Sequence, residues 1–317
     1  MKTYNIVIIG SGPAGLTAAI YAARSEFVPL VIKGVSAGGQ LMITNDVENF
    51  PGFHEGIMGP QLIENMTTQA ERFGTQFHSG SVQSIQVPDD PIKEGFIITL
   101  TDETQIKARS IIIATGARAR LLPLPAVDAL MGHGVSACAT CDGFFYKGKK
   151  VIVVGGGDSA AEEALFLTRF AEKVYMVHRR DQLRASRIMA DRVAANNKIE
   201  VLWNSVLADI YDIEKGKVTG VRLKDTKTDE ERDMDIDGVF FGIGHIPATE
   251  FLHGVVDLNE KKYIIVSDHS RTSVEGIFAA GDCVDALYQQ AITSAGMGCA
   301  AAIDAGNWLA ENGISDS

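Results

Sequence analysis

Two cysteines three positions apart are the residues of this chain best suited to chemistry. Cys138 and Cys141 lie in the segment Ala-Cys-Ala-Thr-Cys-Asp-Gly. Two thiols at this spacing close a small disulfide ring or supply half of a zinc site. Zinc needs two further ligands, and the sequence offers no second Cys-X-X-Cys, only His133 nearby. The pair therefore favours thiol–disulfide exchange, and no metal site is expected.

An acid follows the second thiol directly, at Asp142. A dithiol gains and loses protons as it is reduced and oxidised, so an adjacent carboxyl can act as proton donor or acceptor. A turn residue before Gly143 is an equally good interpretation of this position. The other two cysteines, Cys283 and Cys299, stand alone and are expected to be buried and inert.

A glycine-rich turn near the N-terminus predicts a dinucleotide site. An apolar run over residues 4–9 predicts a buried strand, and an Ala-rich stretch over 16–24 predicts a helix. Between them, Gly10 permits a sharp turn, Gly12 lets the backbone approach a pyrophosphate, and Gly15 allows close helix–strand packing. The acid expected about 20 residues further on for the ribose is absent, and Lys33 stands there instead.

The same pattern of strand, glycine turn and helix returns over residues 150–170. The next predicted strand, 173–177, ends in His178, Arg179 and Arg180, where an acid would favour NAD. Arginines at this place predict NADP(H), because they pair with a 2′-phosphate, and Arg184 can join them. A solvated basic loop is the alternative, which the acidic character of the chain makes less favoured.

A third glycine-marked strand, over residues 276–282, ends in Asp282. Its carboxylate is a candidate ligand for a ribitol or ribose hydroxyl, with a simple helix cap as the alternative. The amides at the start of the final helix, near Gln290 and Ala291, would then face an electron-rich ring.

The order of these segments predicts an α/β protein with two Rossmann-like nucleotide-binding domains of three-layer ββα form, the second inserted into the first. We expect the first domain to combine residues 1–116 with 247–317, and to contain an antiparallel insert over 81–106. The second domain would span 117–246. Segments 118–125 and 245–248 are expected to connect the two.

The composition excludes several classes of function. A formal net charge of −11 argues against nucleic acid and anionic membranes as partners. No apolar run is long enough to span a membrane, and no signal peptide is recognisable. Four cysteines in 317 residues do not form a secreted disulfide scaffold. A cytoplasmic location is expected.

Taken together, the motifs resemble those of the bacterial-type, low-molecular-weight thioredoxin reductases. The resemblance runs from about residue 4 to 310, and its most specific part is Cys-Ala-Thr-Cys-Asp. The segments that carry it are residues 10–15, 38–41, 47–52, 114–117, 138–143, 178–180, 242–245 and 281–282.

This resemblance implies an FAD-dependent homodimer that passes electrons from NADPH through FAD to the cysteine pair, and then to the disulfide of thioredoxin. Cys138 would attack thioredoxin, Cys141 would face the flavin, and Asp142 would handle protons. It also implies that the inserted domain rotates between two poses.

The resemblance also implies the cofactor-binding residues. Those for FAD are Gly10, Ser11, Gly12, Pro13, Ala14, Gly15, Lys33, Gly34, Val35, Ser36, Ala37, Gly38, Gly39, Gln40, Asn49, Val82, Asp282, Gln289, Gln290 and Ala291. Those for NADPH are Asp158, Ser159, His178, Arg179, Arg180, Arg184 and Ile243.

Two positions depart from the family pattern. Gln289 replaces a common arginine, and Asp158 stands where asparagine is frequent. One alternative function is a related two-domain NADPH-dependent flavin reductase that acts on ferredoxin, flavodoxin or another dithiol protein. A redox-sensing module that holds nucleotides without turnover is a second alternative.

Overall fold

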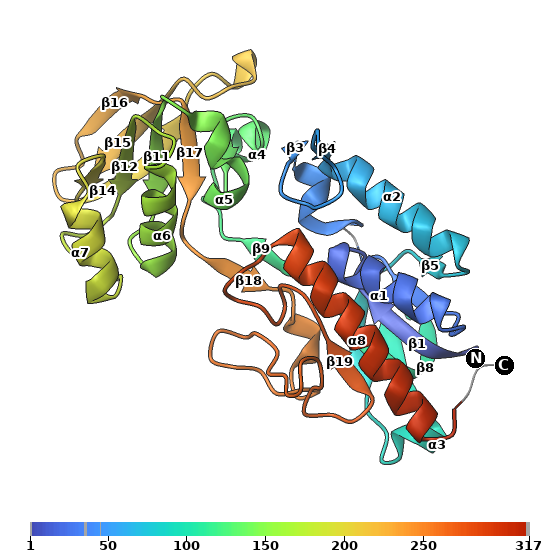
Figure 1. The fold of residues 1–317 in the computed structure, drawn as a ribbon. Coiled ribbons are helices and arrows are strands. Elements are labelled where there is room, and N and C mark those ends of the chain that lie inside the picture. The colour runs from blue at the N-terminus through green and yellow to red at the C-terminus, as the bar shows by residue number, and fades with distance from the viewer. Residues whose placement is uncertain (1, 35–36, 45, 315–317) are drawn as a thin grey trace. The chain divides into compact units, whose positions relative to one another are not determined.

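The chain forms two compact units in a computed structural model that describes residues 2–34, 37–44 and 46–314 (Figure 1). Unit 1 combines Met1–Arg118 with Ile246–Ser317, and unit 2 is Ala119–His245. Two short strands carry the chain across, β9 (Ala117–Ala119) and β18 (His245–Pro247), and they pair with each other. The connecting strand expected over 118–125 is therefore shorter than predicted.

A seven-stranded sheet forms the centre of unit 1, in the order β5-β2-β1-β8-β7-β6, with β19 pairing on β8. The pairs among β5, β2, β1, β8 and β19 are parallel, whereas β6–β7 and β7–β8 are antiparallel. The strands are β1 (Thr3–Ile9), β2 (Leu30–Ile32), β5 (Gln76–His78), β6 (Val82–Gln86), β7 (Phe96–Leu100), β8 (Gln105–Ile113) and β19 (Ile277–Ala279). A separate hairpin joins β3 (Asp46–Val47) to β4 (Ile57–Met58).

The helices of unit 1 pack on a sheet that is apolar on both faces. They are α1 (Pro13–Arg24), α2 (Gly59–Arg72), α3 (Pro91–Glu94) and α8 (Ala291–Glu311), with the 3-10 turns η1 (Gly39–Ile43) and η4 (Glu250–Leu252). Successive side chains of a strand point to opposite faces. Ile6 and Ile8 of β1 pack in one core with α1 and α8, and Val7 and Ile9 in a second core. The run of apolar residues in β1 thus reflects burial on both sides.

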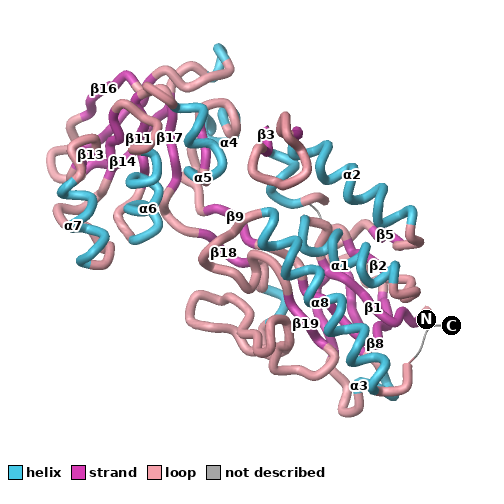
Figure 2. The backbone as a smooth tube through the Cα atoms, in the orientation of Figure 1, coloured by secondary structure: helices cyan, strands magenta, loops and turns pink. Residues whose placement is uncertain are grey.

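Unit 2 is built on a parallel five-stranded sheet, in the order β10-β17-β11-β12-β13 (Figure 2). Its strands are β10 (Val135–Ser136), β11 (Lys150–Val154), β12 (Lys173–Val177), β13 (Ile199–Leu202) and β17 (Gly238–Phe241). Its helices are α4 (Pro125–Leu130), α5 (Ala139–Asp142), α6 (Asp158–Leu167) and α7 (Arg187–Ala195), with the 3-10 turns η2 (Gly143–Tyr146) and η3 (Ile213–Lys215).

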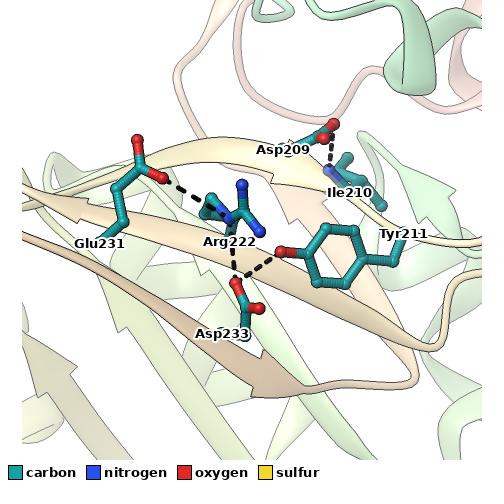
Figure 3. A network of polar contacts seen from close by, with 6 residues as sticks. All are labelled: Asp209, Ile210, Tyr211, Arg222, Glu231 and Asp233. Atoms are coloured by element: carbon teal, nitrogen blue, oxygen red, sulfur yellow. Dashed lines mark hydrogen bonds and ion pairs between the residues drawn. The ribbon is translucent and has the colours of Figure 1, made fainter.

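An antiparallel sheet of three strands completes unit 2, made of β14 (Ser205–Ile210), β15 (Gly220–Asp225) and β16 (Glu231–Asp235). One of its faces is polar (Figure 3). There the Nε of Arg222 lies 3.0 Å from Oδ1 of Asp233 and 3.6 Å from Oε2 of Glu231, while the hydroxyl of Tyr211 donates to Asp233. Exposed pairs of this kind add about 1 kcal/mol or less to stability. The role of this network is therefore structural: it holds β15 and β16 together.

The predicted fold class is confirmed, because both nucleotide-binding sheets form in the expected order along the chain. Among the described residues, no helix is both long enough and apolar enough to cross a membrane.

Candidate redox site and nucleotide loops

Cys138 and Cys141 form a disulfide at the start of α5, with their Cα atoms 5.3 Å apart. Cys138 leaves β10 in an extended conformation and is the N-cap of the helix. Its carbonyl oxygen accepts hydrogen bonds from the backbone N–H groups of Cys141 and Asp142. This single turn brings the two sulfurs together. Within the described residues, no group of three or more His, Cys, Asp or Glu gathers as a metal site would require.

Asp142 is a half-buried acid at the end of the same turn. Burial raises the pKa of this carboxyl, and a hydrogen bond with the Ser136 side chain partly opposes the shift. The Ser136 hydroxyl also accepts the backbone N–H of Cys138 at 3.1 Å. Asp142 ends α5 and is the N-cap residue of η2, without a side-chain cap bond, so its position also fits the turn-residue interpretation. A raised pKa suits a group that must hold and release protons beside a dithiol.

The first glycine turn has the shape that a dinucleotide requires. Gly10 has φ +114°, and a Cβ there would lie 2.2 Å from the carbonyl oxygen of Ala114. A Cβ on Gly15 would meet the oxygen of Gly10 at 2.0 Å, whereas one on Gly12 would meet only the oxygen of Gly38, at 4.0 Å. The first and third glycines thus serve packing, and the second leaves open a cradle that a pyrophosphate fits.

Several residues predicted to bind FAD gather around this turn within unit 1. Ser11 donates to the Lys33 carbonyl at 3.1 Å and accepts the N–H of Gly38 at 3.0 Å. A Cβ on Gly281, just before Asp282, would lie 2.9 Å from the Cβ of Ala14. Three segments that are distant in the sequence therefore meet at the start of α1.

Asp282 is half-buried and accepts a hydrogen bond from Ser294 of α8 at 2.8 Å. Burial raises its pKa to about 6, and this bond opposes the shift. The carboxyl does not cap α8, whose N-cap is Gln290. Asn49 Nδ2 donates to Gln290 Oε1 at 3.2 Å, which joins two further predicted residues.

The remaining residues predicted to bind FAD are more widely spread. The Lys33 ammonium lies over the Phe77 ring, the side chain of Gln40 donates to the carbonyl of Ala117, and Val82 begins β6. Gln289, in place of the family's arginine, donates from Nε2 to the Tyr263 hydroxyl. Val35 and Ser36 lie outside the described residues.

The second glycine turn joins β11 to α6 in unit 2. Gly155 has φ +149°, and a Cβ there would lie 2.5 Å from the Gly242 oxygen, while a Cβ on Gly157 would meet nothing within 4 Å. Asp158 and Ser159 open α6, and Ile243 follows β17 at the same edge of the sheet. This turn also fits a nucleotide, with its open position at Gly157.

The basic loop over residues 178–186 is fastened to that turn. The Gly156 oxygen accepts the backbone N–H groups of Arg184 and Ala185 at 2.6 and 3.1 Å, and Asp158 Oδ1 accepts the N–H of Ser186 at 2.8 Å. Arg179, Arg180 and Arg184 are exposed. None of them forms an ion pair with a carboxylate in the described part of the chain. Three unneutralised guanidinium groups at one edge provide a site for an anion.

His178 differs from the arginines that follow it. Only 4% of its surface is exposed, its ring packs against Gly156, and Nε2 lies 2.9 Å from the Gln182 carbonyl oxygen. Burial lowers its pKa, as do the nearby arginines. A contact between the His178 side chain and a phosphate stays a prediction, and the buried ring favours a role in holding the loop.

Sequence reasoning missed three features of this site. Ser136 links Cys138 to Asp142, Glu163 of α6 contacts Ala139, and Phe144 with Phe145 form an exposed aromatic pair after the disulfide. Phe144 is 57% exposed and Phe145 40%. The sequence did contain a signal for this aromatic pair, because two large aromatic residues directly follow the reactive Cys-X-X-Cys motif.

Comparisons with known proteins agree with this arrangement. The family model "Pyridine nucleotide-disulphide oxidoreductase" matches residues 4–298. A thioredoxin reductase of Mycolicibacterium smegmatis is 52% identical over 309 residues, which cover 97% of each chain. One of Streptomyces clavuligerus is 53% identical, covering 96% of this chain and 94% of its own.

Solved structures agree as well. The thioredoxin reductase from Giardia duodenalis is 43% identical and superposes with a TM-score of 0.92, covering 98% of this chain and all of its own. The one from Streptococcus pyogenes is 40% identical, with a TM-score of 0.91 and coverage of 98% and 99%. The resemblance carried by the sequence motifs is confirmed: this chain belongs to the pyridine nucleotide-disulphide oxidoreductase family and, within it, to the low-molecular-weight thioredoxin reductases.

Proposed function

We propose that this chain is a thioredoxin-disulfide reductase that takes electrons from NADPH by way of FAD and delivers them through Cys138 and Cys141. The observation that carries the proposal is the Cys138–Cys141 disulfide beside the half-buried acid Asp142, in a chain with two nucleotide turns. The alternative that acts on ferredoxin or flavodoxin would leave this disulfide without a role.

FAD is assigned to unit 1 and NADPH to unit 2. The open position at Gly12 and the half-buried Asp282 support the first assignment. The open position at Gly157 and the three exposed arginines support the second. When bound, NADPH supplies a hydride and FAD holds its two electrons for transfer to a disulfide.

The residues of the chain carry out the exchange with the protein substrate. The Cys138 thiolate attacks one sulfur of the thioredoxin disulfide, which forms a mixed disulfide and releases a thiolate on the substrate. The Cys141 thiolate then attacks Cys138, so the second substrate sulfur leaves and the Cys138–Cys141 bond closes. Asp142 gives the proton of its carboxyl to the first substrate thiolate that is released, and the resulting carboxylate takes up the proton that the Cys141 thiol loses before it attacks. The second substrate thiolate takes its proton from water. Two protons and two electrons reach the substrate in total.

The visible spectrum of the purified holoprotein tests this function. The protein should be yellow, and NADPH should bleach the flavin absorbance much faster than NADH does. Oxidised thioredoxin should then restore the absorbance. A colourless protein would contradict the proposal, and so would a bleached one that only oxygen restores.

Phe144→Ser is expected to weaken the recognition of thioredoxin. A solvent-exposed aromatic side chain next to a reactive disulfide provides apolar area for a protein partner, and such anchors typically contribute about 1–3 kcal/mol. The KM for thioredoxin should rise about tenfold or more, while kcat with a small disulfide changes little. Ile213→Ser is the matched control, since this exposed apolar residue lies on η3, away from α5 in the sequence. Equal effects of the two variants would contradict the assignment.

We also propose that the chain acts as a cytoplasmic homodimer. Exposed apolar side chains of unit 1, among them Leu287, Tyr288 and Ile292, support a partner surface there. Two of the four cysteines are free, which supports a reducing compartment.

A further inference from the structure

Glu163 is a carboxyl group on α6 that the proposed function does not use. Its Oε2 atom is closed off from solvent and has no hydrogen-bond partner among the described residues. α6 packs against α5, and the backbone N–H of Ala139, the residue that follows Cys138, lies close enough to the carboxyl to lower its pKa. Glu163 therefore touches the one-turn helix that holds the disulfide. An unpartnered buried oxygen is costly, above all when it is charged.

The surroundings of Glu163 favour its neutral form. Burial raises its pKa to about 8; the backbone N–H of Ala139 lowers it and the charge of Glu162 raises it further. The titratable or charged side chains on the elements packed against α6 are Asp142 of α5, Tyr146 of η2, Lys150 of β11, Lys173 and Tyr175 of β12, and Arg187, Asp191 and Arg192 of α7.

None of these groups supplies a buried positive partner in the described part of the chain. Lys150 and the charged side chains of α7 are exposed, and Lys173 pairs with Glu200 at 3.4 Å. Burial raises the pKa of Tyr146 to about 12, so it stays neutral. Asp142 is itself an acid whose pKa burial raises. Glu163 thus keeps its proton at neutral pH.

We propose that Glu163 is a positioning acid for the redox pair: buried against the first residue of α5, it takes up a proton when the Cys138–Cys141 disulfide is reduced above neutral pH, and so sets the pH dependence of the pair's reduction potential. The inference rests on the proposed function, because it concerns the same disulfide.

The charge balance gives the sign of the effect. Two electrons and one proton convert the disulfide into one thiol and one thiolate. The thiolate forms at α5, the helix against which α6 packs. Its charge disfavours a second negative charge on Glu163, which raises the pKa of Glu163 above its value of about 8 in the oxidised protein. Below pH 8 the carboxyl is protonated in both states and adds nothing. Between pH 8 and the higher pKa of the reduced protein, reduction draws up to one additional proton from water onto Glu163.

Equilibrium redox titration of the holoenzyme tests this inference. The protein is equilibrated with reduced and oxidised dithiothreitol over a range of pH on both sides of 8. The Cys138 and Cys141 thiols are then trapped by alkylation and counted by peptide mass. In the wild type, the plot of reduction potential against pH should become steeper above this pH, by up to the slope that one additional proton per two electrons gives. Glu163→Gln should not show this increase in slope.

Two further variants make the assignment specific. Glu163→Asp retains a titrating carboxyl and should retain a break in the plot. Glu162→Gln removes an exposed charge from the same helix and should move the break to lower pH without abolishing it. A wild type without a break overturns the proposal even if Glu163→Gln does not fold. So does a break that survives in Glu163→Gln. Neither NADPH nor thioredoxin is present, so this proposal can fail while the reductase activity stands.

Discussion

Cys138→Ser is expected to abolish the reduction of thioredoxin, lowering turnover by more than about 10³-fold. The exchange starts with attack by a thiolate, and a serine hydroxyl cannot form the mixed disulfide. The substitution is nearly isosteric, and the first turn of α5 is held by backbone hydrogen bonds from Cys141 and Asp142 to the Cys138 carbonyl oxygen. The fold and the flavin absorbance should therefore survive. Turnover is measured with NADPH and thioredoxin, and compared with NADPH oxidation by a small electron acceptor, which should persist.

Cys299→Ser is the matched control, because Cys299 is a free thiol on α8 of unit 1. It should retain thioredoxin reduction within about twofold, as expected for a substitution away from the site. If Cys138→Ser still reduced thioredoxin, electrons would not pass to thioredoxin through the Cys138–Cys141 disulfide. If it lost NADPH oxidation by the small acceptor as well, the substitution would have damaged the flavin site, and the result would no longer report on the exchange step.

Much of the fold could be predicted because the glycine turns and the apolar strands are encoded locally. The predicted strands at 150–154 and 173–177 coincide with β11 and β12. Their side chains are apolar because helices or a second sheet cover them on both faces. The three strands β14, β15 and β16 were not assigned individually, because half-exposed antiparallel strands give weaker patterns.

The parts of the site that escaped prediction depend on tertiary packing. Nothing in the sequence around Glu163 distinguishes it from Glu162. Yet α6 packs against α5 so that the Oε2 atom of Glu163 is closed off from solvent while Glu162 is exposed. His178 reads as part of a basic cluster, but the turn at Gly156 leaves room for its ring and buries it. In both cases, the position of one residue on its helix or loop determines whether its side chain is buried. The spacing of motif residues in the sequence does not contain this information.

Replacing Arg179 and Arg180 together with alanine is expected to change the coenzyme preference. Hydrogen bonds between guanidinium groups and a phosphate typically contribute about 1.5–3 kcal/mol each. Losing those of two arginines should lower kcat/KM for NADPH by about 10²-fold or more, whereas NADH, which lacks the 2′-phosphate, should change by less than about threefold. Initial rates with both coenzymes, at one ionic strength, give the ratio directly.

The loop should keep its conformation in this double variant, because neither guanidinium holds it. The backbone of residues 178–186 is fixed by the Gly156 oxygen, by Asp158 and by the buried His178 ring against Gly156. Arg187→Ala on α7 is the control, since that exposed arginine forms an ion pair with Asp191 of the same helix, at 4.0 Å. It should leave the NADPH to NADH ratio unchanged. A parallel loss with both coenzymes in the double variant would show that the arginines support the loop rather than bind the phosphate. A selective loss with NADPH would make these two side chains the determinant of coenzyme choice, with His178 as the residue that positions them.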